Sequence, residues 1–425
     1  MPGPQGSPPG AAATPGLHLM AKPAGPICNL DCSYCFYLEK ESFFPSRHRF
    51  LMSEAVLRDY VAQNIGSEPG PEVLFTWQGG EPMLRGLEFY AQAVRYQKEL
   101  AGSKTIRNAL QTNGVLLDDA WCAFLRAEGF MVGISLDGPR EIHDAARLDK
   151  RQAGTFDAVM KGIGLLKRFG IEFNVLVTVT DEVSQHPLPV YRFLRDHALT
   201  HVQFNPVVER LPSKAARRAG LDFSPPGTLD DPSSKLEVSP HSVKPAAYGL
   251  FLTAIFDEWV RADVGTMFVM NFEWALAAFL GLPATICLFT ENCGQALIVE
   301  HNGDVYSCDH FMYPEYRLGN LAQTPISELA TSPTQQAFGQ AKSSQLPDYC
   351  RRCEVRFACH GECPKNRFVM SPDGEPGLNY LCPSYKHYFT HIKKPLQAMA
   401  NLISHSLPAS LIMQAIKGPL AVTLR

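Results

Sequence analysis

Residues 28–37 read Cys-Asn-Leu-Asp-Cys-Ser-Tyr-Cys-Phe-Tyr, and this short segment sets the interpretation of the whole chain. A cubane iron-sulfur cluster takes four thiolates, one for each iron. Cys28, Cys32 and Cys35 supply three, with no fourth cysteine nearby, so one iron would keep an open coordination position. An open position distinguishes a metal site that does chemistry from one that only holds structure. The spacing therefore indicates a small molecule bound on iron, with plain loop cysteines or part of a zinc site as the alternative.

Composition limits where such a cluster could lie. The chain has 425 residues, of which 45% are hydrophobic, enough for one large core and a smaller second domain. Its formal charge of -3 and the lack of a basic face argue against nucleic acid as a partner. The sequence contains no uninterrupted run of about 18 apolar residues, so no membrane-spanning helix is predicted. Residues 1–16 are rich in Ala, Gly and Pro and lack the pattern of a secretory signal, so we expect a disordered lead-in and a cytoplasmic protein.

Twelve cysteines in a reducing compartment favour metal ligation over disulfides. Cys122 lies among apolar residues of a helix-like segment, and a buried, inert thiol accounts for it. Eight more fall in the last third of the chain, and eight make two sets of four. They are Cys287, Cys293, Cys308, Cys350, Cys353, Cys359, Cys363 and Cys382. Two quartets can be drawn from eight cysteines in about 35 ways, and spacing does not choose among them.

Between the two cysteine regions, short apolar runs alternate with amphipathic stretches, which predicts parallel strands joined by helices. The predicted strands are Val73–Trp77, Thr105–Gln111, Phe130–Leu136, Glu172–Thr180 and His201–Phe204. The predicted helices are Leu87–Leu100, a segment ending near Glu128, Thr155–Phe169 and Leu188–His197. Right-handed crossovers between such units build a barrel or an open part of one. The expected fold class is therefore α/β, a partial (β/α)6 barrel.

Ligands of parallel sheets bind at the carboxyl ends of the strands, and polar or glycine-rich signals follow three of the predicted strands. They are Gly79–Glu81, Asn113 with Gly114, and Ser135 with Asp137. Each signal alone fits an ordinary turn. Their shared position favours a binding site.

The chain divides into four predicted parts. Residues 17–245 form the barrel, and a Pro-, Ser- and Lys/Arg-rich segment at about 209–244 is expected to be an exposed insertion. Residues 246–390 contain linker helices and the cysteine-rich domain, and residues 391–425 form a helical cap. The lead-in at 1–16 completes the division.

Two motifs carry a resemblance to a known superfamily. Cys28-x3-Cys32-x2-Cys35 with Tyr34, followed by Gly79-Gly80-Glu81-Pro82, resembles the radical S-adenosylmethionine superfamily. The later cysteines are similar to the SPASM extension, which carries two auxiliary clusters. Its matching pattern is Cys293-x9-Gly303-x4-Cys308, then Cys350-x2-Cys353-x5-Cys359-x3-Cys363 and Cys382.

Within that superfamily, residues 18–23 and 35–40 resemble the anaerobic sulfatase-maturating enzymes. Gln78, the Cys287-x5-Cys293 pair and Asp309 extend the likeness over roughly residues 17–390. The resemblance implies a dehydrogenase that converts a Cys or Ser side chain of a sulfatase precursor to formylglycine. S-adenosylmethionine would be cleaved to methionine and 5'-deoxyadenosine.

The resemblance also implies roles for individual residues. Three 4Fe-4S clusters would be held by Cys28/Cys32/Cys35, by Cys287/Cys293/Cys308/Cys363 and by Cys350/Cys353/Cys359/Cys382. Contacts to S-adenosylmethionine would come from Tyr34, Gly80, Glu81, Ser135, Arg147 and Val208. Gly80 would let the methionyl part approach because it has no side chain. Glu81 would meet the ammonium.

Two further roles concern the substrate peptide. Asp309 would be the base, since burial can raise the pKa of a carboxylate towards working pH. Tyr37 and Gln78 would hold the peptide backbone. A turn aspartate and a packed tyrosine are the plain alternatives.

The expected partners are a peptide with Cys/Ser-x-Pro/Ala-x-Arg and an electron donor such as a flavodoxin or ferredoxin, with the protein itself a monomer. Two features depart from the family pattern: the long 209–244 segment, and Glu362 at a position where glycine is more usual. Thioether, carbon-carbon or epimerising chemistry on a ribosomal peptide stays open as an alternative. A non-catalytic iron-sulfur or zinc scaffold also stays open. Sequence leaves the choice between Cys and Ser undecided.

Overall fold

The structure, a computed structural model, describes residues 17–44, 50–227 and 237–416. The predicted lead-in at 1–16 and the last residues of the predicted cap lie outside the described residues. Among the residues described, none of the helices combines the length and apolar character that a bilayer crossing requires.

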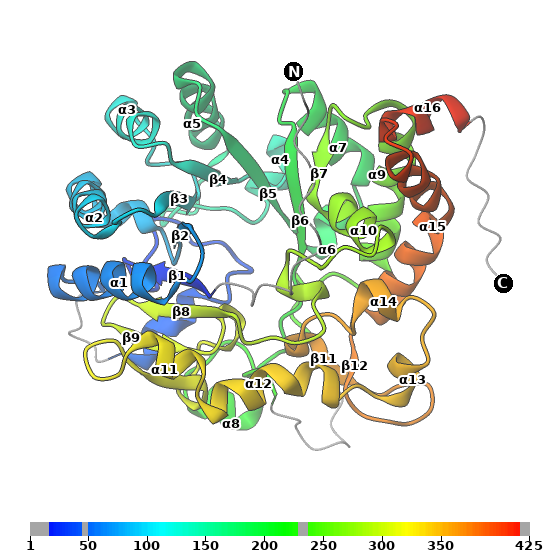
Figure 1. The fold of residues 1–425 in the computed structure, drawn as a ribbon. Coiled ribbons are helices and arrows are strands. Elements are labelled where there is room, and N and C mark those ends of the chain that lie inside the picture. Colours follow the sequence, from blue (N-terminus) through cyan, green and yellow to red (C-terminus); the bar gives the residue numbers. More distant parts are fainter. Residues whose placement is uncertain (1–16, 45–49, 228–236, 417–425) are drawn as a thin grey trace.

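A ten-stranded sheet forms the centre of the molecule, in the order β10-β9-β8-β1-β2-β3-β4-β5-β6-β7. Strands from β8 through β1 to β7 pair in parallel, and β9 and β10 pair antiparallel. The barrel strands are β1 (His18–Lys22), β2 (Glu72–Trp77), β3 (Thr105–Thr112), β4 (Met131–Ser135), β5 (Phe173–Val179) and β6 (His201–Pro206). The predicted parallel α/β partial barrel is confirmed, and Figure 1 shows the strands arranged in an open arc.

Alternation along each strand fixes which face is buried. In β5, Val175, Val177 and Val179 are fully buried, because successive side chains of a strand point to opposite faces of the sheet. At the end of β2, the Phe75 and Trp77 side chains are also fully buried, among the aromatic rings of the first two helices. This apolar layer holds the helices on the outer side of the arc.

The helices that connect the strands line that outer side (Figure 1). They are α1 (Glu54–Ser67), α2 (Leu87–Leu100), α3 (Asp119–Ala127), α4 (Arg140–Asp144), α5 (Phe156–Phe169), α6 (Asp181–Ser184) and α7 (Pro187–Asp196). Local signals set their ends: the Asp118 side chain accepts a hydrogen bond from the Trp121 amide at the start of α3. Gly170, with φ 62°, ends α5 in the left-handed conformation that glycine adopts without strain.

The predicted strands and helices are present, with ends that differ by a few residues. Sequence analysis missed β1, a five-residue strand that follows a Pro- and Gly-rich segment. It also placed the sheet within residues 17–245, whereas β8 (Ala296–Glu300) pairs with β1 along its whole length. The predicted boundary at residue 245 therefore divides strands of a single sheet.

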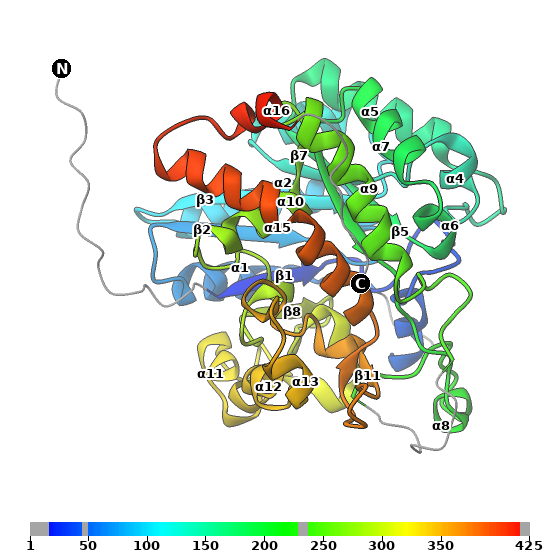
Figure 2. The same cartoon turned by 90° about the vertical axis from the view of Figure 1, so that its right-hand side faces the viewer.

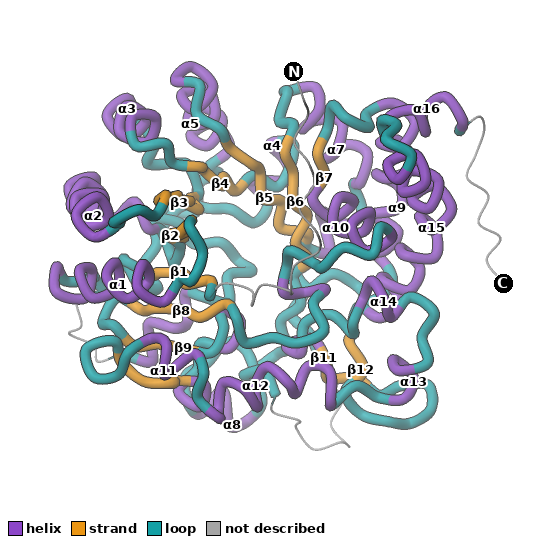
Figure 3. Tube along the Cα trace, in the orientation of Figure 1, coloured by secondary structure: helices purple, strands orange, loops and turns teal. Residues whose placement is uncertain are grey.

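The cysteine-rich region is built largely from loops and short elements (Figure 3). Its elements after β8 are β9 (Asp304–Tyr306), β10 (Arg317–Asn320), α11 (Ile326–Ala330), α12 (Pro333–Ser344), α13 (Asp348–Arg351), α14 (Arg356–Cys359), β11 (Arg367–Val369) and β12 (Leu378–Asn379). Strands β11 and β12 form a separate two-stranded sheet. Because this region contains so little regular secondary structure, we infer that bonds other than backbone hydrogen bonds hold its loops in place.

The predicted insertion at 209–244 is not exposed throughout, which corrects the expectation from its composition. It contains the short helix α8 (Lys214–Arg218), and Leu221 packs with Ala216 and Tyr313. The amides of Asp222 and Phe223 donate to one carboxylate oxygen of Glu39, just after the first cysteine loop. Prolines and serines predicted a loop, but these contacts tie the described part to both domains.

Four helices cover the remaining side of the sheet: β7 (Phe268–Val269) leads into α10 (Met270–Phe279), and α9 (Ala247–Ala262), α15 (Cys382–Ser404) and α16 (Ile412–Ala415) pack around them. Figure 2 shows α15 running diagonally beside α9. The predicted start of the cap at residue 391 falls inside α15, which runs without a break from Cys382. The cap and the cysteine-rich domain therefore share one helix.

We predict that the α9–α15 contact is a main source of stability. Ile392→Ala removes a fully buried side chain of α15 and should lower the free energy of unfolding by about 2–5 kcal/mol. Ile403→Ala on the same helix is the control, because that side chain is 37% exposed and should cost much less. Urea unfolding of both variants measures the difference, and equal costs would contradict this account of the packing.

Candidate active site and cluster-binding cysteines

The first cysteine loop follows directly from the carboxyl end of β1. The Cys35 amide donates to the Cys32 carbonyl at 3.0 Å, which folds the loop back on itself. The Leu30 amide lies 3.4 Å from the Cys28 sulfur, and the Asn113 side-chain amide approaches it to 3.7 Å. Burial raises the pKa of Cys28 to about 12. The three thiols thus form a compact, half-buried group at the edge where the parallel strands end.

Gly80 has a different reason for being glycine than the one predicted. A Cβ at this position would lie 2.0 Å from the Ile27 carbonyl oxygen and 2.6 Å from that of Pro26. Only glycine allows the backbone after β2 to lie against the chain that enters the cysteine loop. The amides of Gly80 and Glu81 donate to Gly25 and Ile27 at 2.9 Å and complete this contact. The approach of a methionyl group to Gly80 stays a prediction.

Glu81 is fully buried and holds strand ends together. Its carboxylate accepts hydrogen bonds from the Met83 amide at 3.0 Å, the Thr112 hydroxyl at 2.9 Å and the Asn113 amide at 2.8 Å. Burial raises the pKa of Glu81 to about 7, although these three donors work against the rise. The carboxylate is therefore engaged inside the fold, and its contact with an ammonium stays a prediction.

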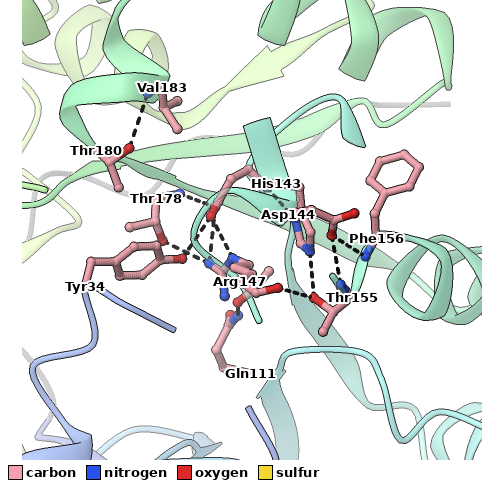
Figure 4. Close-up of polar contacts among 12 residues, drawn as sticks. Tyr34, Gln111, His143, Asp144, Arg147, Thr155, Phe156, Thr178, Thr180 and Val183 are labelled. Atoms are coloured by element: carbon pink, nitrogen blue, oxygen red, sulfur yellow. Dashed lines mark hydrogen bonds and ion pairs between the residues drawn. The ribbon is translucent and has the colours of Figure 1, made fainter. Parts of the chain in front are cut away.

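A buried ion pair lies beside the cysteine loop, at the end of β4. Arg147 donates through Nε to Asp137 Oδ2 at 2.7 Å and through Nη2 to Oδ1 at 3.2 Å. The same carboxylate accepts the Tyr34 hydroxyl at 2.9 Å and the Thr178 amide at 2.8 Å. Figure 4 shows Tyr34, Thr178 and Arg147 converging from three segments. Asp137 therefore fixes two of the residues, Tyr34 and Arg147, for which the resemblance implies contacts to S-adenosylmethionine.

Two further residues, Ser135 and Cys32, belong to the same side of the site as the Asp137–Arg147 pair. The Ser135 hydroxyl accepts a hydrogen bond from the side-chain amide of Gln111 at 3.3 Å. The pKa of Cys32 is raised by burial to about 11, although the Arg147 guanidinium beside it acts to lower it. Arg147 thus links the ion pair to a cysteine of the loop.

Asp309 directly follows Cys308 and meets Lys22, the last residue of β1. The Lys22 ammonium lies 2.6 Å from Asp309 Oδ1. Burial acts to raise the pKa of Asp309, but Lys22 and His310 outweigh it, and the pKa is lowered. We expected a net rise of the Asp309 pKa on burial. This prediction is wrong, because the buried Lys22 ammonium lies against the carboxylate. Asp309 is held as an ionised acceptor at the edge of the sheet.

Tyr37 is buried and its hydroxyl is occupied. It donates to the Glu300 carboxylate at the end of β8, and His301 Nδ1 lies 3.0 Å from the other oxygen of that carboxylate. The Lys22 ammonium lies 4.5 Å from the centre of the Tyr37 ring, a cation–π contact. Tyr37 therefore supports Lys22, and its contact with a substrate peptide stays a prediction.

The remaining predicted residues lie at the same edge. Gln78 follows β2 and is partly exposed, and its backbone amide donates to the Ala21 carbonyl at 2.9 Å. The Val208 side chain is buried, and its carbonyl accepts from the Lys365 ammonium at 2.7 Å. Lys365 also pairs with Glu209, which draws the second domain against the end of β6. Neither position tests the predicted ligand contacts.

The eight later cysteines lie in two groups. In the first group, which we call the inner group, burial raises the pKa of Cys308, and the neighbouring Cys287 and Cys293 raise it further. Cys363 belongs to the same group, since the other three cysteines contribute to its raised pKa after burial and Glu362.

The second group, here the outer group, surrounds a small cavity lined by Cys350, Cys353, Cys359 and Cys382. Burial raises the pKa of Cys382 to about 12, with Cys350 and Cys353 adding to the rise. These neighbours are those of the pairing that the resemblance implies. Ligation of iron by either group stays a prediction.

The donor chemistry of the three groups fits iron-sulfur clusters, because buried thiols are their ordinary ligands. Within the described ranges, no three His, Cys, Asp or Glu side chains converge closely enough to hold one metal ion. A cluster spreads its thiolates over several irons, so the two kinds of site need different ligand spacing.

Several functional side chains were missed by sequence reasoning. Glu300 carried no motif signal, and Lys22 was noted only as part of the segment 18–23, because the roles of both depend on partners far away in the chain. Asp137 was noted only as a polar residue after a strand, and its position beside Ser135 was the one available signal.

Comparisons with known proteins agree with this geometry. Residues 23–194 match the radical SAM superfamily, and residues 287–354 match the SPASM iron-sulfur cluster-binding domain. The chain is 44% identical to a serine-type anaerobic sulfatase-maturating enzyme of Bacteroides thetaiotaomicron, over 94% of this chain and 95% of the relative. It is 31% identical to a cysteine-type enzyme of Clostridium perfringens, over 92% and 100%.

Among solved structures, native anSMEcpe with bound AdoMet and Cp18Cys peptide superposes with a TM-score of 0.78 at 31% identity, covering 92% of this chain and 100% of that one. Fold and cysteine pattern thus define a radical S-adenosylmethionine protein with a SPASM domain. The chain belongs to the family of anaerobic sulfatase-maturating enzymes.

We predict that Gly80→Ala disrupts the first cysteine loop. The new Cβ would collide with backbone atoms of Ile27, and relieving that contact should cost about 1–3 kcal/mol and displace Cys28. Iron bound by a chain that lacks the eight later cysteines measures the effect, with loading expected to fall. Gly164→Ala, which meets nothing within 4 Å on α5, is the control, and unchanged loading in both variants would contradict the prediction.

A second prediction concerns the buried ion pair. Asp137→Asn leaves Arg147 without its counter-charge and should destabilise the fold by about 3–5 kcal/mol. It should also weaken binding of S-adenosylmethionine, because Tyr34 and Arg147 lose their anchor. Asp157→Asn breaks an exposed pair with Arg140 and should cost no more than about 1 kcal/mol. Thermal unfolding and equilibrium dialysis separate the two, and an equal response would refute the role of Asp137.

Proposed function

We propose that the protein oxidises a serine or cysteine side chain of a sulfatase precursor to formylglycine, with S-adenosylmethionine as co-substrate. One observation carries the proposal. The Lys22–Asp309 ion pair joins the carboxyl end of β1, from which the chain leads into the first cysteine loop, to the turn that follows Cys308 of the inner cysteine group. Family membership supports it, since relatives named for sulfatase maturation match nearly the whole chain.

Three clusters would supply the redox chemistry: Cys28, Cys32 and Cys35 would hold the first, and the inner and outer groups the other two. When bound, they would supply one-electron chemistry: reductive cleavage of S-adenosylmethionine at the first site, by which a hydrogen atom would be taken from the target carbon, and removal of the remaining electron at the other two. Only one proton is then left for the protein to accept.

Asp309 is placed to accept that proton. Lys22 keeps its carboxylate ionised and fixes its direction from the end of β1. Tyr37 and Glu300 in turn hold Lys22 in place. A positioned carboxylate gains rate over a mobile one because its geometry is set before the reaction.

The binding residues would act around this base. Arg147 and Tyr34, both anchored on Asp137, would bind the co-substrate together with Gly80, Glu81, Ser135 and Val208. Gln78, at the end of β2, is the partly exposed candidate for binding the peptide backbone. Holding all reactants at one edge keeps the reactive carbon near a single target hydrogen.

Serine is the favoured target residue. The serine-type relative shares 44% of its residues with this chain, against 31% for the cysteine-type relative. We also propose a flavodoxin or ferredoxin as electron donor, and a monomeric protein. Thioether, carbon-carbon or epimerising chemistry fits less well, since both auxiliary groups contain four cysteines and leave no iron open.

The test incubates the anaerobic, iron-loaded protein with a reductant, S-adenosylmethionine and a Ser-x-Pro-x-Arg peptide or its Cys counterpart. Formylglycine formation predicts an aldehyde at the target residue, detected by mass spectrometry and by reaction with a hydrazide. Cleavage of S-adenosylmethionine with a differently modified peptide would favour the alternative peptide chemistry. Absence of cleavage would overturn both and favour a scaffold.

We predict that Asp309→Asn uncouples the two halves of the reaction. Peptide oxidation should fall by about 10²-fold or more, because no base of similar placement replaces the carboxylate, while S-adenosylmethionine is still cleaved. Asp304→Asn is the matched control, because this carboxylate begins the neighbouring strand β9 and pairs with Arg317 instead. Product formed per 5'-deoxyadenosine released is the readout, and an unchanged ratio in Asp309→Asn would exclude the proposed base.

A further inference from the structure

The loop between Cys359 and Cys363 joins the outer cysteine group to the inner one and has a strained backbone. Three successive residues have positive φ: His360 at 47°, Gly361 at 73° and Glu362 at 52°. This conformation is unfavourable for a residue with a side chain. Glycine would serve at position 362 without that cost, so the side chain of Glu362 calls for an explanation.

The Glu362 side chain is buried and held by amide donors. Its Oε2 accepts hydrogen bonds from the side chains of Asn379 at 2.5 Å and Asn366 at 3.2 Å. The Glu362 amide donates to the Cys359 carbonyl at 2.8 Å, and Asn379 also donates to the Cys363 carbonyl at 3.3 Å. The carboxylate is therefore fixed in direction next to ligand candidates of both groups. Buried carboxylates are rare without such partners.

Glu362 acts electrostatically on both groups. Burial raises the pKa of Cys287, Cys293 and Cys363 in the inner group and of Cys359 in the outer group, and Glu362 adds to each rise. The Lys342 ammonium acts in the opposite direction on Cys287 and Cys293. Burial raises the pKa of Glu362 itself, and the Asn379, Cys363 and Asn366 donors together with Lys342 oppose that rise.

Arg367 lies in the same region and supports the loop. Its guanidinium donates to the carbonyls of His360 and Gly361 at 3.0 Å and of Glu362 at 3.1 Å. These bonds hold the strained backbone without forming an ion pair with the carboxylate. The Glu362 carboxylate is thus hydrogen-bonded to neutral side-chain amides, while Lys342 and Arg367 interact with it electrostatically and favour its ionised form.

We propose that the Glu362 carboxylate is a tuning group that lowers the reduction potential of the two auxiliary clusters. An added electron is disfavoured near a buried anion, because low-dielectric surroundings screen the repulsion poorly. The inner cluster should respond more strongly, since Glu362 directly precedes Cys363. A lower potential favours passing an electron onward over retaining it. The proposal rests on cluster binding by the inner and outer groups, part of the function proposed above.

The test measures midpoint potentials of the reconstituted, full-length protein by redox titration monitored by electron paramagnetic resonance. Substrate and S-adenosylmethionine are omitted, so the readout does not depend on activity. Glu362→Gln keeps the shape and removes the charge, and should raise the potential of the inner cluster by at least tenfold in the reduction equilibrium, about 59 mV for one electron. A smaller rise in the same direction is expected for the outer cluster.

Two further variants make the result decisive. Glu362→Gly also removes the charge but relieves the backbone, so it should raise both potentials and stays available should the Gln variant load poorly. Asp263→Asn alters a buried carboxylate that accepts from Tyr191 on the far helices, and should leave the potentials unchanged. Iron counted per chain accompanies each titration.

The outcomes separate the two proposals. Unchanged potentials in fully loaded Glu362→Gln and Glu362→Gly would overturn the tuning role and leave the proposed function standing. An equal shift in Asp263→Asn would overturn it as well. Wild-type protein that binds no iron at the inner and outer groups would overturn both proposals.

Discussion

The pairing of β1 with β8 is the constraint on which the rest of the site depends. Its register places Lys22 opposite Glu300, and the two strands come from opposite ends of the functional region of the chain. The first cysteine loop follows the carboxyl end of β1, and the turn after Cys308 follows β9, which pairs antiparallel with β8. Loss of the β1–β8 register would separate Lys22 from Asp309 and so break the link between the first cysteine loop and the inner group.

Two buried ion pairs lie near these strand ends, and each has a different role. Asp137 neutralises Arg147 and positions Tyr34, whereas Lys22 holds Asp309 as an acceptor. Further into the cysteine-rich domain, the Glu362 carboxylate is hydrogen-bonded to neutral side-chain amides, with Lys342 and Arg367 as electrostatic neighbours. A buried charge that is not directly paired costs free energy. We therefore connect it to the redox groups around it and not to stability.

Much of the fold could be predicted from sequence, because strand alternation and helical spacing are local signals. The cysteine motifs and the polar residues after strands also located the site, since parallel strands align their carboxyl ends. The predictions that were wrong concern residues whose contacting partners lie far away in the chain. Burial of Asp309 suggested a raised pKa, yet Lys22, more than 280 residues earlier in the chain, reverses the direction. At Gly80, sequence reasoning missed a structural reason for glycine, because an added Cβ would meet the backbone of Ile27, more than 50 residues earlier in the chain.

The prediction of an exposed insertion at 209–244 was wrong for a similar reason, since composition could not reveal that Glu39 anchors this segment. The most direct test of the central claim is an anaerobic crystal structure of the iron-loaded protein, with iron located by anomalous scattering. The account predicts iron at three separate places, beside Cys28/Cys32/Cys35, the inner group and the outer group, with Asp309 between the first two. Iron shared between the inner and outer groups, or absent from the first loop, would contradict it.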